Sequence, residues 1–258
     1  MTWTKYHVIL LIPTYIIEIV VAIILGKVLK NKDEKIRMIP IQVVTIILLA
    51  LEVAKQIYGI VKGYDLYWIP LHFCSLFLFI MPVVSFYNGK YKNEARILGI
   101  VISSCLFLFM VVYPDIVFGG AAIQASWDYL LGRGGRFIEL HSVLFHILAV
   151  GLFFLFLALD LVEFNTKKDI ILLLIAFAIY CIVVGPLSNI IDVNFNNFAR
   201  CNAPFLENVR LSLNDSLKWI GQVIYVLMIS VGTLVVPTLA YLTFRGVDKL
   251  IKKISCRN

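Results

Sequence analysis

Charged residues are scarce in this 258-residue chain: Asp, Glu, Lys and Arg together make up 15% of it, whereas 61% is hydrophobic. A water-soluble domain of this length could not bury so much apolar surface, so the composition excludes a soluble globular protein. Polar stretches long enough to fold separately are also missing from the sequence. We therefore expect a single transmembrane domain over residues 1–258, integral to a membrane.

Cysteine is scarce as well. The five cysteines are odd in number, scattered and without a CxxC pair, which argues against a disulfide framework and a zinc ribbon. We expect neither a metal site nor a cofactor. The net charge of +7 could suggest nucleic acid, but basic residues of a membrane bundle more often set its orientation and meet anionic lipid head groups. We therefore expect no nucleic-acid partner.

Seven apolar stretches fill most of the chain, each about 20 residues long, which is the length that an α-helix needs to cross a bilayer. The first is too long for a secretory signal peptide, and no small-residue cleavage site follows it. The sequence therefore predicts an all-α bundle of seven transmembrane helices, near residues 7–29, 39–61, 68–87, 96–113, 136–159, 169–189 and 218–244.

Lys and Arg are unevenly divided between the connections of this bundle. If the spans alternate in direction, 15 of the 23 basic residues lie at the end that holds the C-terminal tail and 7 at the end that holds the N-terminus. The remaining one, Lys55, lies inside a span. The positive-inside rule then predicts a cytoplasmic C-terminus and an external N-terminus. This arrangement requires an odd number of spans, which seven satisfies.

The few polar residues of the spans gather at one depth. Ionisable groups inside a membrane cost energy and therefore suggest a functional site. At a rise of 1.5 Å per residue, those of spans two, three and five lie about 5–15 Å below the outer surface. The polar residues at or near this level are Glu52, Lys55, His72, Cys74, Asp115, Glu139, His141, His146 and Asn189. A thiol, imidazoles and carboxylates at one depth favour chemistry on a lipid over a passive span.

The spacing in span five selects among its polar residues. Glu139 and His146 are seven residues apart and share a helix face with Ser142, whereas His141 points about 140° away from His146. A carboxylate on the same face can orient an imidazole and keep it basic. We therefore expect His146, oriented by Glu139, to be the general base, with His141 as the second candidate.

Two further features leave alternatives open. The pair of Glu52 and Lys55 has i,i+3 spacing, so it either neutralises itself and holds helices together or anchors a lipid head group. In span three, Pro70 is expected in the first helical turn. His72 and Cys74 would then point nearly opposite ways, which makes His72 a poor base for the thiol.

The two long connections lie on the predicted outer side. Residues 114–135 contain the amphipathic stretch IQASWDYLL, which predicts an interfacial helix or a lid over the site, unless it is an ordinary surface loop. Residues 190–217 are polar but include Phe195 and Phe198. Such a segment can dip into the bundle if protein buries its backbone.

Several short motifs carry a family resemblance. They are the acidic residue and lysine of span two, PLHFC at 70–74, the proline-aspartate after span four, the histidines of span five, and Asn189 followed by Asn194-Phe195. In these motifs the chain resembles the YwaF-like bacterial integral membrane proteins and their vertebrate relatives of the transmembrane protein 164 family, acyltransferases that place polyunsaturated acyl chains on ether lysophospholipids. By general plan it is more distantly similar to the androgen-induced intramembrane hydrolases, which use a threonine and a histidine.

The resemblance implies an enzyme class and a nucleophile. The cysteine of the PLHxC-like segment, here Cys74, would accept the acyl group, and a span-five histidine would be its partner. We therefore expect a cysteine-dependent acyltransferase or hydrolase acting on phospholipid or lysophospholipid in the outer half of a bacterial cell membrane. The residues expected to bind substrate are Glu52, Lys55, His72, Asp115, Asn189 and Asn194.

Two other functions fit the same polar residues. The glutamate, lysine and histidines could form the ion or proton path of a transporter or channel. Three histidines and an acidic residue could instead be the ligands of an intramembrane zinc hydrolase, although His141 and His146 diverge on the helix.

Overall fold

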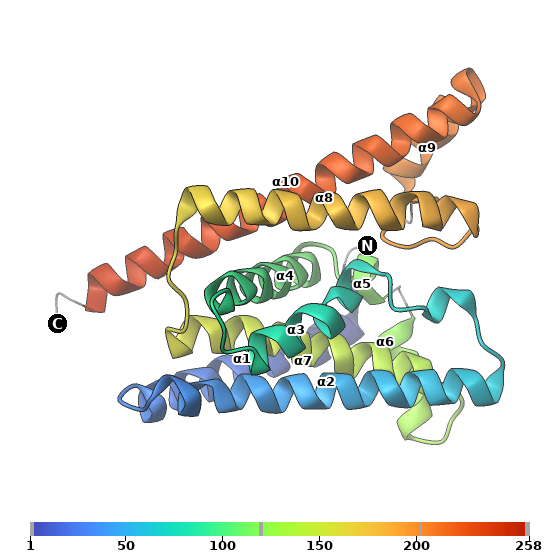
Figure 1. Cartoon of the computed structure of the whole chain (residues 1–258). Coiled ribbons are helices and arrows are strands. Elements are labelled where there is room, and N and C mark those ends of the chain that lie inside the picture. The colour runs from blue at the N-terminus through green and yellow to red at the C-terminus, as the bar shows by residue number, and fades with distance from the viewer. Residues whose placement is uncertain (1–2, 119–120, 202, 256–258) are drawn as a thin grey trace.

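The computed structural model describes residues 3–118, 121–201 and 203–255, and this part of the chain is helical (Figure 1). The α-helices are α1 (Lys5–Leu29), α2 (Glu34–Lys62), α3 (Leu76–Phe86), α4 (Lys92–Val112), α5 (Asp115–Phe118), α6 (Ala122–Leu130), α7 (Phe137–Leu159), α8 (Thr166–Ile190), α9 (Pro204–Leu217) and α10 (Trp219–Ser255). Two short 3₁₀-helices, η1 (Leu66–Trp68) and η2 (Phe73–Ser75), precede α3.

Six of these helices are long and apolar enough to cross a membrane: α1, α2, α4, α7, α8 and α10. The third predicted span, 68–87, differs from the prediction. Its α-helix, α3, has only 11 residues, or about 16 Å at 1.5 Å per residue, roughly half of the hydrocarbon core. The rest of that segment is extended chain and 3₁₀ turns, so a continuous third helix is not formed.

One end of the bundle is tied together by charged side chains. Glu34 at the start of α2 pairs with Lys92 and Arg96 of α4, at 2.8 Å in each case. The Arg37 guanidinium donates to the carbonyl oxygens of Leu159 and Asp160, where α7 ends. The connections after α1, α3 and α7 therefore meet at this end, which we call the charged end.

The two chain termini lie at opposite ends of the bundle (Figure 1). At the N-terminal end, the Thr4 side chain caps α1, and the Trp3 indole donates to the Val111 carbonyl at the end of α4. At the charged end, the Tyr241 hydroxyl of α10 donates to Asp169 at the start of α8 at 2.6 Å.

Helix α7 is central to the bundle, because it packs against α1, α2, α4 and α6. Helix α4 packs on α7 and α3 on one side and on α10 on the other, so it joins this group to α8, α9 and α10. A glycine allows the close contact of α1 with α7: a Cβ at Gly26 would lie 2.8 Å from the carbonyl oxygen of Ala158. Small residues permit such close backbone approach between membrane helices.

Replacing Gly26 with valine is expected to destabilise the bundle. The added side chain would meet rigid backbone of α7, and overpacking of this kind lowers the free energy of unfolding by about 1–3 kcal/mol. Unfolding of the purified protein in detergent would measure the loss. Gly246→Val on α10 is the matched control, because a Cβ there meets nothing within 4 Å. Equal stabilities of the two variants would contradict this packing.

Candidate functional site: a polar cavity at the N-terminal end of the bundle

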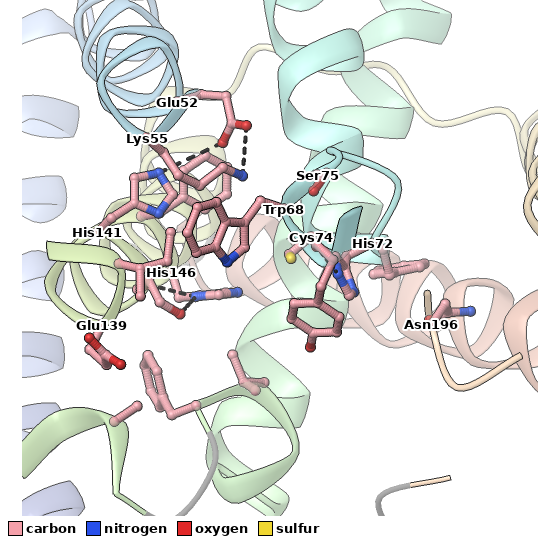
Figure 2. A pocket seen from close by; sticks show the side chains of 18 of the residues that line it. Glu52, Lys55, Trp68, His72, Cys74, Ser75, Glu139, His141, His146 and Asn196 are labelled. Carbon is pink, nitrogen blue, oxygen red and sulfur yellow. Dashed lines mark hydrogen bonds and ion pairs between the residues drawn. The ribbon is translucent and has the colours of Figure 1, made fainter. Parts of the chain in front are cut away.

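A cavity of about 460 Å³ opens at the bundle end opposite the charged end. Its wall includes eight of the ten residues proposed from the sequence: Glu52, Lys55, His72, Cys74, Glu139, His141, His146 and Asn194. Figure 2 shows Glu52, Lys55, His141 and His146 on the side of α2 and α7, and Cys74 and His72 on the side of the segment before α3. Residues from four separate parts of the chain thus meet around one space.

The segment before α3 is not helical, so the expected place of Pro70 in a first helical turn is wrong. Ile69 is extended (φ −56°, ψ 131°) and so is His72 (φ −67°, ψ 157°). The physical reason is that the residue before a proline is pushed out of the helical region. Cys74 lies in the 3₁₀ turn that leads into α3. The argument that helix geometry separates His72 from Cys74 therefore no longer applies.

His72 is fixed by its neighbours. Its Nε2 lies 3.1 Å from the Tyr67 carbonyl oxygen, and its ring contacts the rings of Tyr67 and Phe195 at centroid distances of 4.4 and 5.1 Å. A ring nitrogen beside a carbonyl carries the proton, so Nδ1 of the neutral ring is the proton acceptor. His72 is therefore an oriented base on the same wall as Cys74.

A buried ion pair joins α2 to the cavity. Lys55 Nζ lies 2.7 Å from Glu52 Oε1, and Gln56 Nε2 donates to the same oxygen at 2.6 Å. The other carboxylate oxygen lies 3.7 Å from His141 Nε2 on α7 (Figure 2). The carboxylate thus connects α2 with α7, and His141, rather than His146, is the imidazole nearest to an acidic side chain among the described contacts.

Glu139 does not orient His146, contrary to the prediction from their shared helix face. Its carboxylate accepts from the backbone N–H of Arg136 at 3.0 Å and from the guanidinium of the same residue at 2.6 Å. His146 instead has its Nδ1 2.6 Å from the backbone carbonyl oxygen of Ser142. The first helical turn attracts Glu139 because its N–H groups are unpaired, so a local cap competes with the distant imidazole.

The connection after α8 enters the bundle, which confirms the prediction for its first part: Phe195 and Phe198 are fully buried. Asn196 and Asn197 have positive φ values of 49° and 60°, a conformation that asparagine tolerates well. The Ser188 hydroxyl donates to the Val193 carbonyl and accepts from the backbone N–H of Phe195. The loop is thereby held so that Asn194, Asn196 and Asn197 form part of the cavity wall.

Asn189 was expected to bind substrate, but it lies outside the cavity wall. Its amide donates to the Gly185 carbonyl at 2.8 Å and accepts from Gln222 of α10 at 2.8 Å. Gln222 also donates to the carbonyls of Phe198 and Ala199. Asn189 is therefore a structural residue that supports the loop. The side chain of Asp115, also expected to bind substrate, lies outside the described residues.

The helix after this loop is anchored by one carboxylate. Glu207 on α9 accepts from the Arg210 guanidinium at 2.5 Å and from the backbone N–H of Cys201 at 2.7 Å. The Arg210 guanidinium, helped by that N–H, holds the pKa of Glu207 below its usual range. The carboxylate is therefore charged near neutral pH and fixes α9 against the loop.

Sequence reasoning missed some of the wall. Trp68 lies on it (Figure 2), but a tryptophan at the end of a span usually indicates an interfacial anchor. Asn196 was overlooked beside Asn194, although the run NFNNF at 194–198 was a visible signal. Phe118 and Ala122 come from α5 and α6, so these two helices of the connection 114–135 contribute to the cavity wall.

The helices and the cavity define a polytopic α-helical membrane protein with a polar site buried at one end of its bundle. The chain belongs to the TMEM164 family, because the sequence model of that family matches residues 2–243. Searches of curated proteins and of solved structures each found no match. Family membership agrees with the resemblance in the short motifs and shows an integral membrane protein.

Removing Lys55 is expected to destabilise the fold, because it leaves the buried Glu52 carboxylate without its ammonium partner. Loss of one member of a buried pair typically lowers the free energy of unfolding by about 3–5 kcal/mol. Lys55→Met should therefore unfold earlier in detergent, and the double variant Glu52→Gln/Lys55→Met should regain most of the loss.

Lys168→Met is the control, because the pair of Lys168 with Glu94 is at the surface and is worth about 0–1 kcal/mol. If Lys55→Met is no less stable than this control, the buried pair does not hold α2 in place. If the double variant is stable but inactive, the pair serves the site as well as the fold.

Proposed function

We propose that this protein is a cysteine-dependent lipid acyltransferase, with hydrolysis as the outcome when water is the acceptor. The observation that supports it most directly is the common cavity of Cys74 and His146, with His146 Nδ1 beside a backbone carbonyl. A thiol and an oriented imidazole are the components of nucleophilic acyl transfer. The family resemblance independently points to Cys74 as the acyl acceptor.

The tautomer of His146 supports its role as the base. Nδ1 lies 2.6 Å from the Ser142 carbonyl oxygen, and a carbonyl can only accept, so Nδ1 carries the proton and Nε2 has the lone pair. A carbonyl thus does the orienting that the sequence assigned to Glu139. The Cys74 thiol is partly buried on the cavity wall, and we infer that His146 takes its proton as the attack proceeds.

The proposed reaction has two balanced halves. Cys74 Sγ attacks the carbonyl carbon of an acyl ester while its proton moves to His146 Nε2; the carbon–sulfur bond forms, and the ester carbon–oxygen bond breaks. The leaving alkoxide takes the proton from His146. The hydroxyl of a lysophospholipid then attacks the thioester, gives its proton to His146, and the Cys74 sulfur leaves and is reprotonated.

Charge that develops on the carbonyl oxygen needs donors. Lys55 contributes an ammonium group to the same wall. Helix α3 begins at Leu76, two residues after Cys74, and the first N–H groups of a helix favour negative charge. His72 has its protonated nitrogen against Tyr67, so we assign it as an alternative base rather than as an oxyanion donor. Asn194 and Glu139 are placed to contact the head group.

The proposal includes an orientation in the membrane. The charged end has most of the basic residues, so the positive-inside rule would place it in the cytoplasm. The third pass would then be made by the chain from Leu66 to Phe86, part of it extended and buried in protein. The cavity would open toward the outer leaflet, in a bacterium the outer half of the cell membrane.

The two alternatives find less support. Transport would need a polar path, but the described wall of the cavity lies at one end, and most of the buried side chains beyond it are apolar. A zinc hydrolase would need clustered ligands, and within the described residues no group of three or more His, Cys, Asp or Glu side chains is placed to hold an ion.

Cys74→Ala should abolish labelling by an activity-based acyl probe and transfer of acyl groups between phospholipid and lysophospholipid in proteoliposomes. His146→Ala should lower the initial rate about 10²- to 10⁴-fold, the usual contribution of a general base. Mass spectrometry of the labelled protein would identify the modified residue, and lipid analysis would measure transfer.

Cys181→Ala is the matched control, because Cys181 is a buried thiol of α8 outside the cavity wall, and it should keep full activity. A rate that falls more in His72→Ala than in His146→Ala would exchange the roles of the two histidines. If labelling persists in Cys74→Ala, Cys74 is not the nucleophile, and the transporter alternative gains support.

A further inference from the structure

A second cavity of about 300 Å³ adjoins the first. The two share four wall residues: Phe73, Phe109, Asn196 and Asn197. We propose that this second cavity binds one acyl chain of a membrane lipid whose ester lies in the polar cavity. The inference rests on the proposed function only for the reaction of that ester. Binding of the acyl chain is a separate property that does not require the reaction.

The wall of the second cavity follows one face of α10. Its residues there are Tyr225, Met228, Ile229, Gly232, Thr233, Val236 and Pro237. Residues spaced by three and four lie on one side of a helix, and twelve residues from first to last correspond to about 18 Å. One leaflet fills about 15 Å of the hydrocarbon core. The stretch of α10 that lines the cavity is therefore about as long as the acyl chain that the cavity would take from the bilayer.

The wall is suited to an apolar guest, because its polar groups are bonded to each other. The Tyr225 hydroxyl donates to the Asn197 carbonyl at 2.7 Å. The Asn196 amide donates to the Thr233 hydroxyl at 3.1 Å. Apolar side chains of α9 and α10 make up much of the remaining surface. Each buried CH₂ group of a chain contributes roughly 0.8 kcal/mol, so a chain of this length would be held firmly.

Phe73 places the apolar cavity next to the nucleophile. It directly precedes Cys74, lines both cavities, and packs edge-on against Phe109 of α4 and flat against Phe177 of α8. A chain that runs along α10 and passes the rings of Phe73 and Phe109 would bring its ester into the polar cavity beside Cys74. These rings therefore form the boundary between tail and ester.

The bilayer itself can supply the guest from the side. Met228 and Gly232 line the cavity and are also exposed on the surface of α10, which faces lipid if α10 spans the membrane. A tail can therefore enter laterally without passing through water. A water-soluble ligand would instead have to cross this apolar face.

The test uses the full chain in proteoliposomes with a phospholipid that has a diazirine at the end of one acyl chain. After irradiation, peptide mapping is expected to find the crosslinks on residues 228–237 of α10 and on Phe109. Gly232→Leu should reduce them at least fivefold, because a Cβ at Gly232 meets nothing within 4 Å and the added side chain would fill the cavity. Gly246→Leu, equally open but outside the wall, should leave them unchanged.

A second variant protects the test against a folding defect. Val236→Phe, on the last turn of α10 that lines the cavity, should shift the preferred tail toward shorter chains, which general destabilisation would not do. The proposal would be overturned if the crosslinks were spread over the lipid-facing helices. It would also be overturned if neither Gly232→Leu nor Val236→Phe changed the crosslinks. Crosslinks at the cavity in a native protein that shows no acyl labelling of Cys74 would retain the tail site and reject the enzyme. If acyl labelling of Cys74 is unchanged in both Gly232→Leu and Val236→Phe, the enzyme is retained and the tail site is rejected.

Discussion

The constraint on which this structure depends is that hydrocarbon offers no hydrogen bonds to the backbone. Helices satisfy their own N–H and C=O groups, so any non-helical chain at membrane depth must be paired by protein. Here the segment before α3 is paired by side chains from two other helices: Gln56 donates to the Trp68 carbonyl and Tyr180 to the Leu71 carbonyl. Gln222 does the same for the loop after α8 through the Phe198 carbonyl. Non-helical chain inside the bundle is stable only because these partners exist.

The irregular segments are also what creates the site. An uninterrupted third helix would fill the space now left between α2, α7 and the loop after α8, and Cys74 would face a direction fixed by helix geometry. The extended chain at Ile69 instead displaces the start of α3, and the thiol lies in a turn that opens into a cavity. The same break puts Phe73 at the junction with the apolar cavity. Irregular backbone thus joins a polar cavity to a largely apolar one, which is the pairing that the proposed lipid ester would require.

The buried charges show how local and long-range contacts compete for a side chain. Glu139 shares a helix face with His146, but the backbone N–H and the guanidinium of Arg136 lie just before its helix, and it accepts from both. Glu52 lies inside α2, away from the helix termini, and its carboxylate contacts Lys55 and His141 instead. Spacing along one helix therefore identifies which groups can meet, while the competing donors nearby decide which of them do.

Composition and periodicity alone determined that the protein is a helical membrane bundle, because apolar length and backbone pairing leave no other choice in a bilayer. The shared depth of the polar residues, together with the family resemblance that added Asn194, proposed ten site residues, and eight of them lie around one cavity, because the cost of ionisable groups at membrane depth is rarely met unless they act together. What only the tertiary structure decided are the partners: that His146 bonds a carbonyl, that Asn189 supports a loop, and that α3 is short. These depend on contacts between residues far apart in the chain. The local sequence pattern shows which polar side chains are present but not how far apart they lie in the fold, and a hydrogen bond forms only between groups at short distance.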